Sequence, residues 1–160
     1  MTLGHRVAVM HKGKLQQLDA PLNIYNQPAN LFVAEFVGSS GMNLVDGEFD
    51  QPSRSFRAHG LVFAMNDAHL SKLAGRQRVT LGVRPEHIQI SSNQFDGWQC
   101  ATVYVTELMG SETLVFLEAE KQRLVARAPS DFRAASGTRL WFQFDRAKTH
   151  FFDSDSGQRL

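Results

Sequence analysis

The stretch Trp98-Gln99-Cys100-Ala101-Thr102-Val103-Tyr104-Val105-Thr106-Glu107-Leu108 decides the fold of this chain. Inside it, hydroxyl-bearing side chains alternate with valines, and a period of two is typical of a strand that buries one face. Comparable runs follow at close spacing, at residues 113–118, 123–128, 139–144 and 150–152. The sequence therefore predicts a series of short strands in its second half.

The same pattern extends upstream of this stretch. Short apolar or alternating runs, separated by turn residues, lie at residues 43–49, 55–59, 61–65, 78–83 and 87–90. One segment, Asp67 to Leu73, is instead predicted to form a helical turn. Many short strands at close spacing indicate a mostly β (β-rich α+β) fold, which we expect to be a small barrel or sandwich of the OB-like kind.

The first forty residues have a different pattern, which predicts a β-hairpin followed by two short helices. Val7 to Met10 and Leu15 to Leu18 are apolar runs on either side of a turn that contains Gly13. Asp19 is expected to cap the first helix, with Pro21 in its opening turn.

A second helix is expected from about Ala29 to Val37, ending at Gly38, because its apolar side chains recur four residues apart. Ser39-Ser40-Gly41 is typical of a linker, so we expect one domain over residues 1–41 and another over residues 42–160. The first is too short to cover all its apolar side chains, among them Tyr25, Phe32, Val33 and Phe36. We expect these to pack on the β domain or to be buried by a partner.

Composition excludes several classes of protein. The chain has 160 residues, and its 17 Lys and Arg against 16 Asp and Glu give a net charge of +1, without the basic excess of nucleic-acid-coating proteins. No run approaches the roughly 18 apolar residues that span a bilayer. A single cysteine, Cys100, excludes an intrachain disulfide and fits a reducing, cytoplasmic location. We expect Cys100 to be a small buried thiol in the middle of a strand.

Catalytic motifs are not visible in the sequence. The P-loop pattern needs two glycines at fixed spacing and a hydroxyl after Lys, but Gly13-Lys14 is followed by Leu15 and has Ala8 at the position of the first glycine. No two histidines have metalloprotease spacing, and no Gly-x-Ser-x-Gly elbow surrounds Ser111. The sequence predicts that the chain is not an enzyme and holds no cofactor or metal.

Four groups of segments resemble one family. They are Met1 to Met10 with Gly13, Leu15-Gln16-Gln17, Ala20-Pro21, Ile24-Tyr25, Pro28-Ala29 and Phe32 to Ser39; then Met42-Asn43-Leu44; then Leu81 to Ile88; and last Val105 to Leu114 with Phe144-Asp145 and His150 to Asp153. They resemble, in that order, the end of the nucleotide-binding domain, the start and central signature of the regulatory domain, and the TOBE module. The family is the ATP-binding subunit of bacterial ABC importers for sugars and related solutes, of the MalK/UgpC type.

This resemblance implies a function for the chain as a part of such a subunit. The family's Walker A lysine, signature loop, Walker B acid and switch histidine lie upstream of the point that aligns with Met1, so ATP and Mg²⁺ would belong to the full-length parent. The chain resembles the truncated or excised tail of that parent, with a regulatory role and a homodimer formed through the β domain. The parent would bind importer membrane subunits at the cytoplasmic side of the inner membrane.

Two clusters are candidates for an interface or a regulatory contact. In Arg84-Pro85-Glu86-His87, Pro85 ends a strand and keeps Arg84 extended, and Arg84 could pair with Glu86; the alternative is an ordinary strand end with a structural ion pair. Around Gly110, which permits a tight turn, Glu107, Ser111 and Thr113 lie near a hairpin tip and could contact a ligand or only form the turn.

Two other functions remain open from the residues themselves. A stand-alone TOBE-like module could bind a small oxyanion or solute, using Lys121, Arg123 and Arg127 with the hydroxyls of Ser111 and Thr113. Binding of single-stranded nucleic acid is less favoured, because that function pairs aromatic platforms with a basic track and most phenylalanines lie at predicted core positions.

Overall fold

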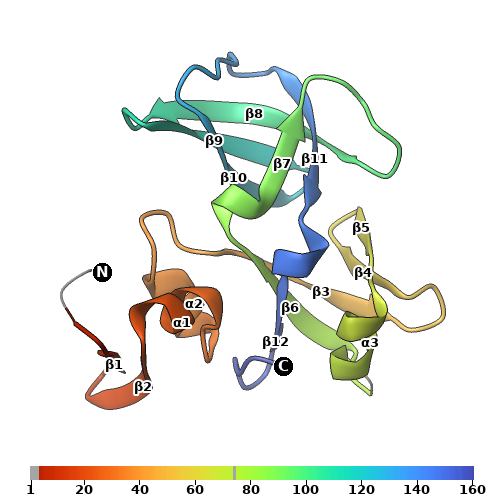
Figure 1. The fold of residues 1–160 in the computed structure, drawn as a ribbon. Coiled ribbons are helices and arrows are strands. Elements are labelled where there is room, and N and C mark those ends of the chain that lie inside the picture. The colour runs from red at the N-terminus through yellow and green to blue at the C-terminus, as the bar shows by residue number, and fades with distance from the viewer. Residues whose placement is uncertain (1–3, 74) are drawn as a thin grey trace.

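The computed structural model describes residues 4–73 and 75–160, in three connected parts (Figure 1). A hairpin and two short helices form what we call the N-terminal unit: β1 (Val7–His11), β2 (Lys14–Asp19), α1 (Pro21–Asn26) and α2 (Leu31–Phe36). The remaining strands form two five-stranded antiparallel sheets, which together we call the β unit. The mostly β fold class and the order hairpin, helix, helix, strands are confirmed.

The upper sheet in Figure 1 has the strand order β10-β9-β8-β11-β7. Its strands are β7 (Ile88–Ser91), β8 (Gln99–Leu108), β9 (Glu112–Ala119), β10 (Gln122–Pro129) and β11 (Arg139–Phe144). On β8 the alternation buries Ala101 and Val103, until a change of register between Val103 and Val105 turns Val105 toward solvent. The same alternation exposes Cys100, so the prediction of a buried thiol was wrong.

The lower sheet has the order β12-β6-β3-β4-β5. Its elements are β3 (Asn43–Asp50), β4 (Ser55–Ala58), β5 (Leu61–Ala64), β6 (Arg78–Val83) and β12 (His150–Asp153), and α3 (Asp67–Leu73) follows β5 as predicted. The last strand of the chain thus pairs with β6, far from its neighbours in sequence. The sequence predicted the strands but not their division into two sheets.

The two sheets share one core and are joined by two crossings. A single cluster of buried side chains takes residues from both sheets, including Phe56 and Leu81 below and Leu117 and Phe142 above. The 3₁₀ turns η1 (Pro85–His87) and η2 (Arg146–Lys148) carry the chain between the sheets, and the Asp145 amide donates to the His87 carbonyl oxygen at 2.9 Å. The two crossings therefore lie side by side.

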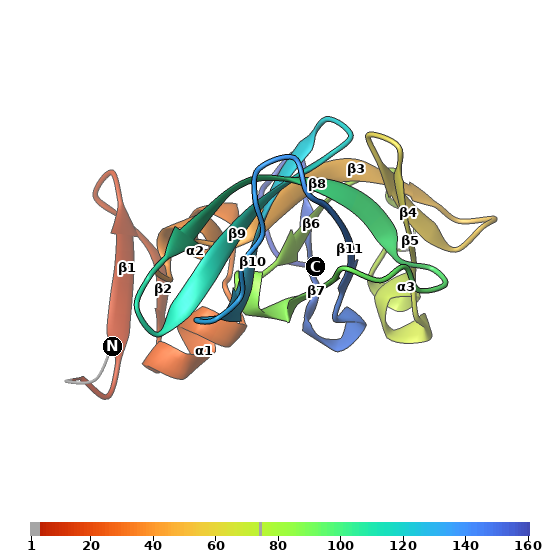
Figure 2. The same cartoon turned by 90° about the horizontal axis from the view of Figure 1, so that it is seen from above.

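The N-terminal unit has a small core of its own. Val9, Ile24, Val33 and Val37 are buried together, and the stacked rings of Phe32 and Phe36 confirm the predicted contact one helical turn apart. Figure 2 shows this unit beside the β unit and at one end of the molecule. No helix in the described part of the chain has the length and apolar character needed to cross a bilayer.

The helix ends of this unit differ from prediction. Ala20, not Asp19, is the N-cap residue of α1, and the Asp19 carboxylate instead accepts from the Ala20 amide at 2.7 Å and from Asn23 Nδ2 at 2.9 Å. Helix α2 begins only at Leu31, where the Asn30 side chain caps it by accepting from the Val33 amide at 3.0 Å. The helix is therefore shorter than its apolar spacing indicates.

Candidate functional site

Arg84 connects the N-terminal unit to the β unit. It follows β6 and precedes Pro85, which keeps Arg84 extended (φ −76°, ψ 151°) and ends the strand as predicted. Its guanidinium Nη1 donates to the Val37 carbonyl oxygen at 2.6 Å, and Nη2 donates to that of Tyr25 at 2.8 Å. The guanidinium carbon also lies 3.8 Å from the centre of the Tyr25 ring. We call this set of contacts the Arg84 clamp.

The Arg84 clamp is an internal contact, because only 2% of Arg84 is exposed and Pro85 is buried as well. The guanidinium of Arg84 is therefore engaged within the chain, and a role of this cluster at an interface stays a prediction. Gly38 leaves room for the guanidinium: a Cβ there would lie 3.2 Å from Arg84 Nη1, and Gly38 also has φ of +118°. Gly38, which we predicted to end the helix, is thus also needed for the close packing of Arg84.

Glu86 belongs to a second network beside the clamp. The Tyr25 hydroxyl donates to Glu86, whose partner in an ion pair is Arg127 at 3.7 Å and not Arg84 as predicted. Arg127 Nε also lies 3.1 Å from the Glu112 carboxylate.

Burial together with the hydrogen bond to Glu86 raises the pKa of Tyr25 to about 12. Burial alone would raise the pKa of Glu86, but the Tyr25 hydroxyl and the Arg127 charge hold it below its usual value.

Asn43 joins the two sheets close to this network. Its Nδ2 donates to the Val83 and Val125 carbonyl oxygens at 3.1 and 2.9 Å, and its Oδ1 accepts from the Val125 amide at 2.6 Å. One side chain therefore holds β3, β6 and β10 together. Neither the Tyr25–Glu86 contact nor this bridge was predicted, because the partners lie 61 and 82 residues apart in sequence.

The second predicted cluster is a hairpin tip. The Met109 amide donates to the Glu112 carbonyl oxygen at 2.8 Å, and Gly110 has φ of +85°, as a tight turn between β8 and β9 requires. Glu107 and Ser111 are exposed, whereas Thr113 is buried and its Oγ1 has no hydrogen-bond partner among the residues that the structure describes. Of the two hydroxyls that we expected at the tip, that of Ser111 therefore belongs to an exposed residue and that of Thr113 to a buried one.

The residues that we predicted for an oxyanion site do not form a group of unpaired charges. Arg123 pairs with Glu118 at 3.0 Å and lies over the Tyr104 ring, while Arg127 pairs with Glu86 and Glu112. Carboxylates that already neutralise an arginine oppose the binding of an anion to it. Lys121 is exposed in the turn between β9 and β10.

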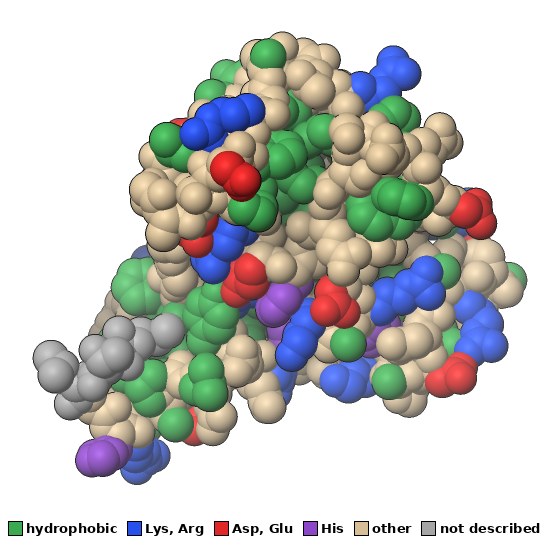
Figure 3. Space-filling model, turned by 45° about the horizontal axis from the view of Figure 1, so that its top comes forward, with side chains coloured by type: hydrophobic (Ala, Val, Ile, Leu, Met, Phe, Trp, Pro, Cys, Tyr) green, Lys and Arg blue, Asp and Glu red, His purple; other side chains and the backbone are tan. Residues whose placement is uncertain are grey.

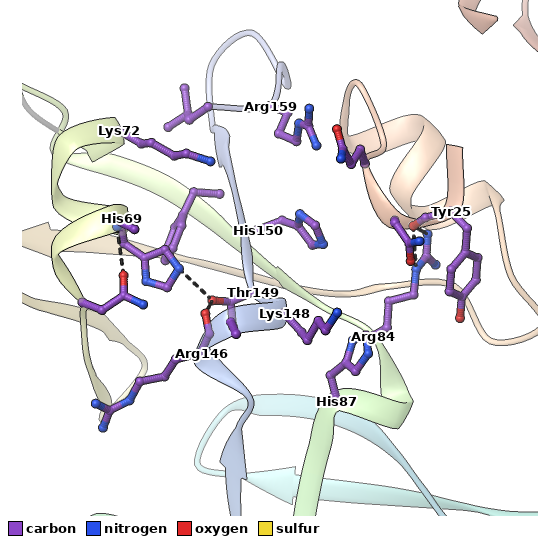
Figure 4. Close-up of a pocket in the computed structure, with 17 residues that line it drawn as sticks. Tyr25, His69, Lys72, Arg84, His87, Arg146, Lys148, Thr149, His150 and Arg159 are labelled. Carbon is purple, nitrogen blue, oxygen red and sulfur yellow. Dashed lines mark hydrogen bonds between the residues drawn. The ribbon is translucent and has the colours of Figure 1, made fainter. Parts of the chain in front are cut away.

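A cavity of about 730 Å³ lies next to the Arg84 clamp (Figure 4). Its lining comes from α1, α3, η1, η2, β12 and the C-terminal residues, so it lies between the N-terminal unit and the β unit. Sequence reasoning missed this cavity, although Arg146, Lys148 and His150 alternate with small residues and could have indicated a basic face. Within the described residues, no three His, Cys, Asp or Glu side chains lie close enough together to hold a metal ion.

Two protein families match overlapping parts of the chain. Residues 38–88 match the MalK OB fold domain, and residues 81–152 match the TOBE domain. The overlap, residues 81–88, contains Arg84 and the first crossing between the sheets.

Curated relatives match the whole chain. The sn-glycerol-3-phosphate import ATP-binding protein UgpC of Salmonella typhi is 39% identical over 160 residues, and UgpC of Escherichia coli O157:H7 is 36% identical over 160 residues. Each alignment covers 100% of this chain but 44% of UgpC, so the chain spans less than half the length of these relatives.

A solved structure has a similar fold. The cytoplasmic molybdate-binding protein ModG, with molybdate bound, aligns with a TM-score of 0.55 over 68% of this chain and 94% of the ModG chain. At 10% sequence identity this likeness concerns the fold alone. Residues 38–152 of the chain thus match the MalK OB fold and TOBE domain families, and over its whole length the chain is similar to the C-terminal part of UgpC, the ATP-binding subunit of an ABC importer.

Proposed function

We propose that this chain is the C-terminal regulatory and dimerisation part of the ATP-binding subunit of an ABC importer for sugars or related solutes. The observation that carries the proposal is the Arg84 clamp. It binds carbonyl groups at the ends of both α1 and α2, so a displacement of the β unit displaces the N-terminal unit with it. A regulatory domain needs such a connection in order to act on the domain that precedes it.

The surface of the N-terminal unit supports this proposal. Five large apolar side chains remain exposed on it, Met10, Leu15, Leu18, Leu22 and Phe36, with exposed fractions from 43% to 68%. Figure 3 shows such side chains beside the N-terminal end of the chain. An apolar surface of this kind on so small a unit is typical of a protein contact, and the ATP-binding part of the subunit is the proposed partner. ATP and Mg²⁺ would bind to that part and not to this chain.

Dimerisation is assigned to the tip of the β8–β9 hairpin. Tyr104, Val105, Leu108 and Met109 are 52%, 38%, 60% and 55% exposed and lie close together in sequence on one strand end. A two-fold contact between two such tips would cover them. In the whole transporter the pair would lie in the cytoplasm and bind the membrane subunits.

Sedimentation velocity over a hundredfold range of concentration tests the dimer. We expect a monomer–dimer equilibrium that Leu108→Glu shifts to monomer. Val62→Glu, at a side chain of β5 that is 44% exposed, is the matched control and should change nothing. A strictly monomeric wild type, or an equal effect of both variants, contradicts the assignment.

A chimera tests the regulatory role. Residues 1–160 of this chain replace the matching C-terminal region of UgpC from Salmonella typhi, and uptake of glycerol 3-phosphate is measured in cells that lack UgpC. We expect the chimera to restore uptake and Arg84→Met to lower it without loss of ATP binding. The isolated chain should not bind ATP in calorimetry. A folded chimera that binds ATP but restores no uptake, or micromolar ATP binding by the isolated chain, contradicts the proposal.

The alternative function, a stand-alone module for a small oxyanion, has weaker support. ModG binds molybdate, and its fold is similar to that of this chain. The arginines that we predicted for the task, however, are already paired with carboxylates.

A further inference from the structure

The cavity beside the Arg84 clamp has a lining of one charge sign. Five Lys or Arg and three His residues line it, and no Asp or Glu does. In Figure 4, Lys72, Lys148 and Arg159 lie around His150, whereas the Arg146 guanidinium points away from it. Arg84 is occupied by the carbonyl groups of the clamp, but Lys72, Lys148 and Arg159 form no ion pair within the described residues. Three cations are thus available to a ligand.

Burial and the positive charges of the lining act together on the pKa of His150. Burial, followed by the charges of Arg159, Arg84, His87 and Lys72, lowers the pKa of His150 to about 4. Two acidic groups act on His87: Glu86, which is bound by Tyr25 and Arg127, and Asp145, which accepts from the Ala147 amide at 3.0 Å. Neither lines the cavity, so the lining itself contributes only positive charge.

Unused hydrogen-bonding groups lie in the same place. The Nδ1 atoms of His69 and His87 are buried without a hydrogen-bond partner in the described structure. Buried polar atoms are normally satisfied, so these two ring nitrogens are exceptions beside the cavity. Figure 3 shows His, Lys and Arg side chains, with Asp and Glu side chains between them, at the surface across the middle of the molecule.

The three available cations come from separate elements, which limits the chemistry of the ligand. Lys72 lies in α3, Lys148 in η2 and Arg159 after β12. A carboxylate has two oxygens, whereas a phosphomonoester has three terminal oxygens and nearly two charges, and can accept from one cation on each oxygen. The volume of about 730 Å³ lies within the range of small-molecule pockets and far exceeds what a bare ion fills.

The lining also offers groups for the rest of such a molecule. Asn26, Gln27 and Asn66 supply amides that can bind hydroxyls, and Phe151 and Leu160 supply apolar contacts. We propose that this cavity binds a small organic phosphomonoester, with the phosphate between Lys72, Lys148 and Arg159. The site is distinct from the residues that we predicted for an oxyanion, and the proposal does not depend on the regulatory role proposed above.

Titration calorimetry of the whole chain with three probes tests the ligand class. Glycerol 3-phosphate is the phosphomonoester, inorganic phosphate the bare ion, and glycerol the uncharged body. We expect glycerol 3-phosphate to bind with a Kd below about 1 mM, inorganic phosphate to bind several times more weakly, and glycerol not to bind. Phosphate binding as tight as that of the ester would overturn the organic part of the proposal, and no binding of either would overturn all of it.

Variants of exposed cations locate the site without loss of folding. Lys72→Gln, Lys148→Gln and Arg159→Gln should each weaken binding of glycerol 3-phosphate about threefold to fivefold, and a double variant of the two lysines about tenfold or more. Lys121→Gln and Arg139→Gln remove exposed charges elsewhere and should leave the Kd unchanged. Equal effects in both sets would show unspecific attraction and overturn the assignment to this cavity.

A proton measurement gives an independent readout. A bound phosphate ester next to His150 must raise the pKa of that ring, because it adds negative charge beside it. The imidazole signals of His150, followed by NMR from pH 4 to 7, should therefore titrate at higher pH in the presence of glycerol 3-phosphate. The ring of His59, which is exposed and does not line the cavity, is the internal control. An unchanged His150 titration at saturating ligand contradicts the proposal.

Discussion

The β unit buries its apolar side chains more completely than the N-terminal unit does. In the β unit, two sheets close over one continuous core that extends from Val45 to Phe151. The N-terminal unit has four buried apolar residues in its cluster and leaves side chains such as Leu22 and Phe36 more than half exposed. The difference teaches that the smaller unit obtains its order from its attachment to the larger one.

The attachment combines hydrogen bonds with a small apolar cluster, in which Leu31 and Ala34 of α2 pack with residues of the β unit, including Phe152. Arg84 binds the ends of α1 and α2, and the C-terminal segment runs past the start of α2. There the Leu31 amide donates to the Gly157 carbonyl oxygen at 2.9 Å, and the Arg159 amide donates to that of Ala29 at 3.0 Å. The N-terminal unit is therefore held to the β unit by hydrogen bonds together with a small apolar contact, whereas the β unit is held together by one large core.

The largest effect is expected from breaking the attachment itself. Arg84→Met leaves the buried carbonyls of Tyr25 and Val37 without a donor and should lower the free energy of unfolding by about 3–4 kcal/mol. Hydrogen exchange should show loss of protection in residues 21–37 while the sheets remain protected. Arg139→Met, at an exposed arginine, is the control and should cost less than about 0.5 kcal/mol. Unchanged protection in residues 21–37 would show that the N-terminal unit is stable by itself.

A smaller loss of stability, affecting both units, is expected when a substitution disturbs the packing of the β unit. A Cβ on Gly47 would lie 2.4 Å from the Arg57 carbonyl oxygen and 2.5 Å from Phe56 Cζ, so β3 and β4 would have to separate. Gly47→Ala should lower the free energy of unfolding by about 2–3 kcal/mol in urea titration. Gly110→Ala, where a Cβ meets nothing within 4 Å, should cost only about 1 kcal/mol of backbone strain. Equal losses for the two variants would contradict the close approach at Gly47.

A pH effect of intermediate size is expected where the two units meet. The pKa of His150 falls from 6.5 to about 4 on folding, so between these values the unfolded chain binds a proton that the folded chain does not. Stability is therefore fully present above pH 6.5 and falls as the pH falls toward 4. Because the ring is partly exposed, we expect a loss of about 1–2 kcal/mol between pH 7 and 5.

Urea titrations of wild type and His150→Gln at both pH values isolate this contribution. The pKa values of His69 and His87 are also lowered, with burial as the first cause, so part of the pH dependence should remain in the variant. If His150→Gln loses as much stability between pH 7 and 5 as wild type does, His150 is not the group that titrates.

The smallest of these effects belongs to the N-terminal unit alone. Asn30 caps α2 through the Val33 amide and donates to Gln16 Oε1 at 2.9 Å, so Asn30→Ala should cost about 1 kcal/mol. Asn26→Ala, at an exposed residue of α1, is the matched control. Hydrogen exchange in α2 should increase without change in the sheets. A loss of protection in the sheets would show that the two units unfold as one.

The extent of prediction from sequence differs between elements. Strands β6 and β11 have the bounds that alternation predicted, because a period of two is a local property of neighbouring residues. Cys100 was predicted on the wrong face, because which side of a strand meets the core depends on the sheet around it. The Arg84 cluster was located correctly, but its partners were not, because they belong to α1, α2 and β10.

The sequence by itself determined where the strands and turns lie, that Pro85 ends β6, and which families the residue pattern resembles. These properties depend on residues within a few positions of one another, whose conformational preferences act in the unfolded chain as well. Only the tertiary structure decided that Arg84 binds the N-terminal unit, that Glu86 pairs with Arg127, and that Lys72, Lys148 and Arg159 surround one histidine. Burial and charge act through space, so they depend on how the sheets and crossings place residues that are far apart along the chain.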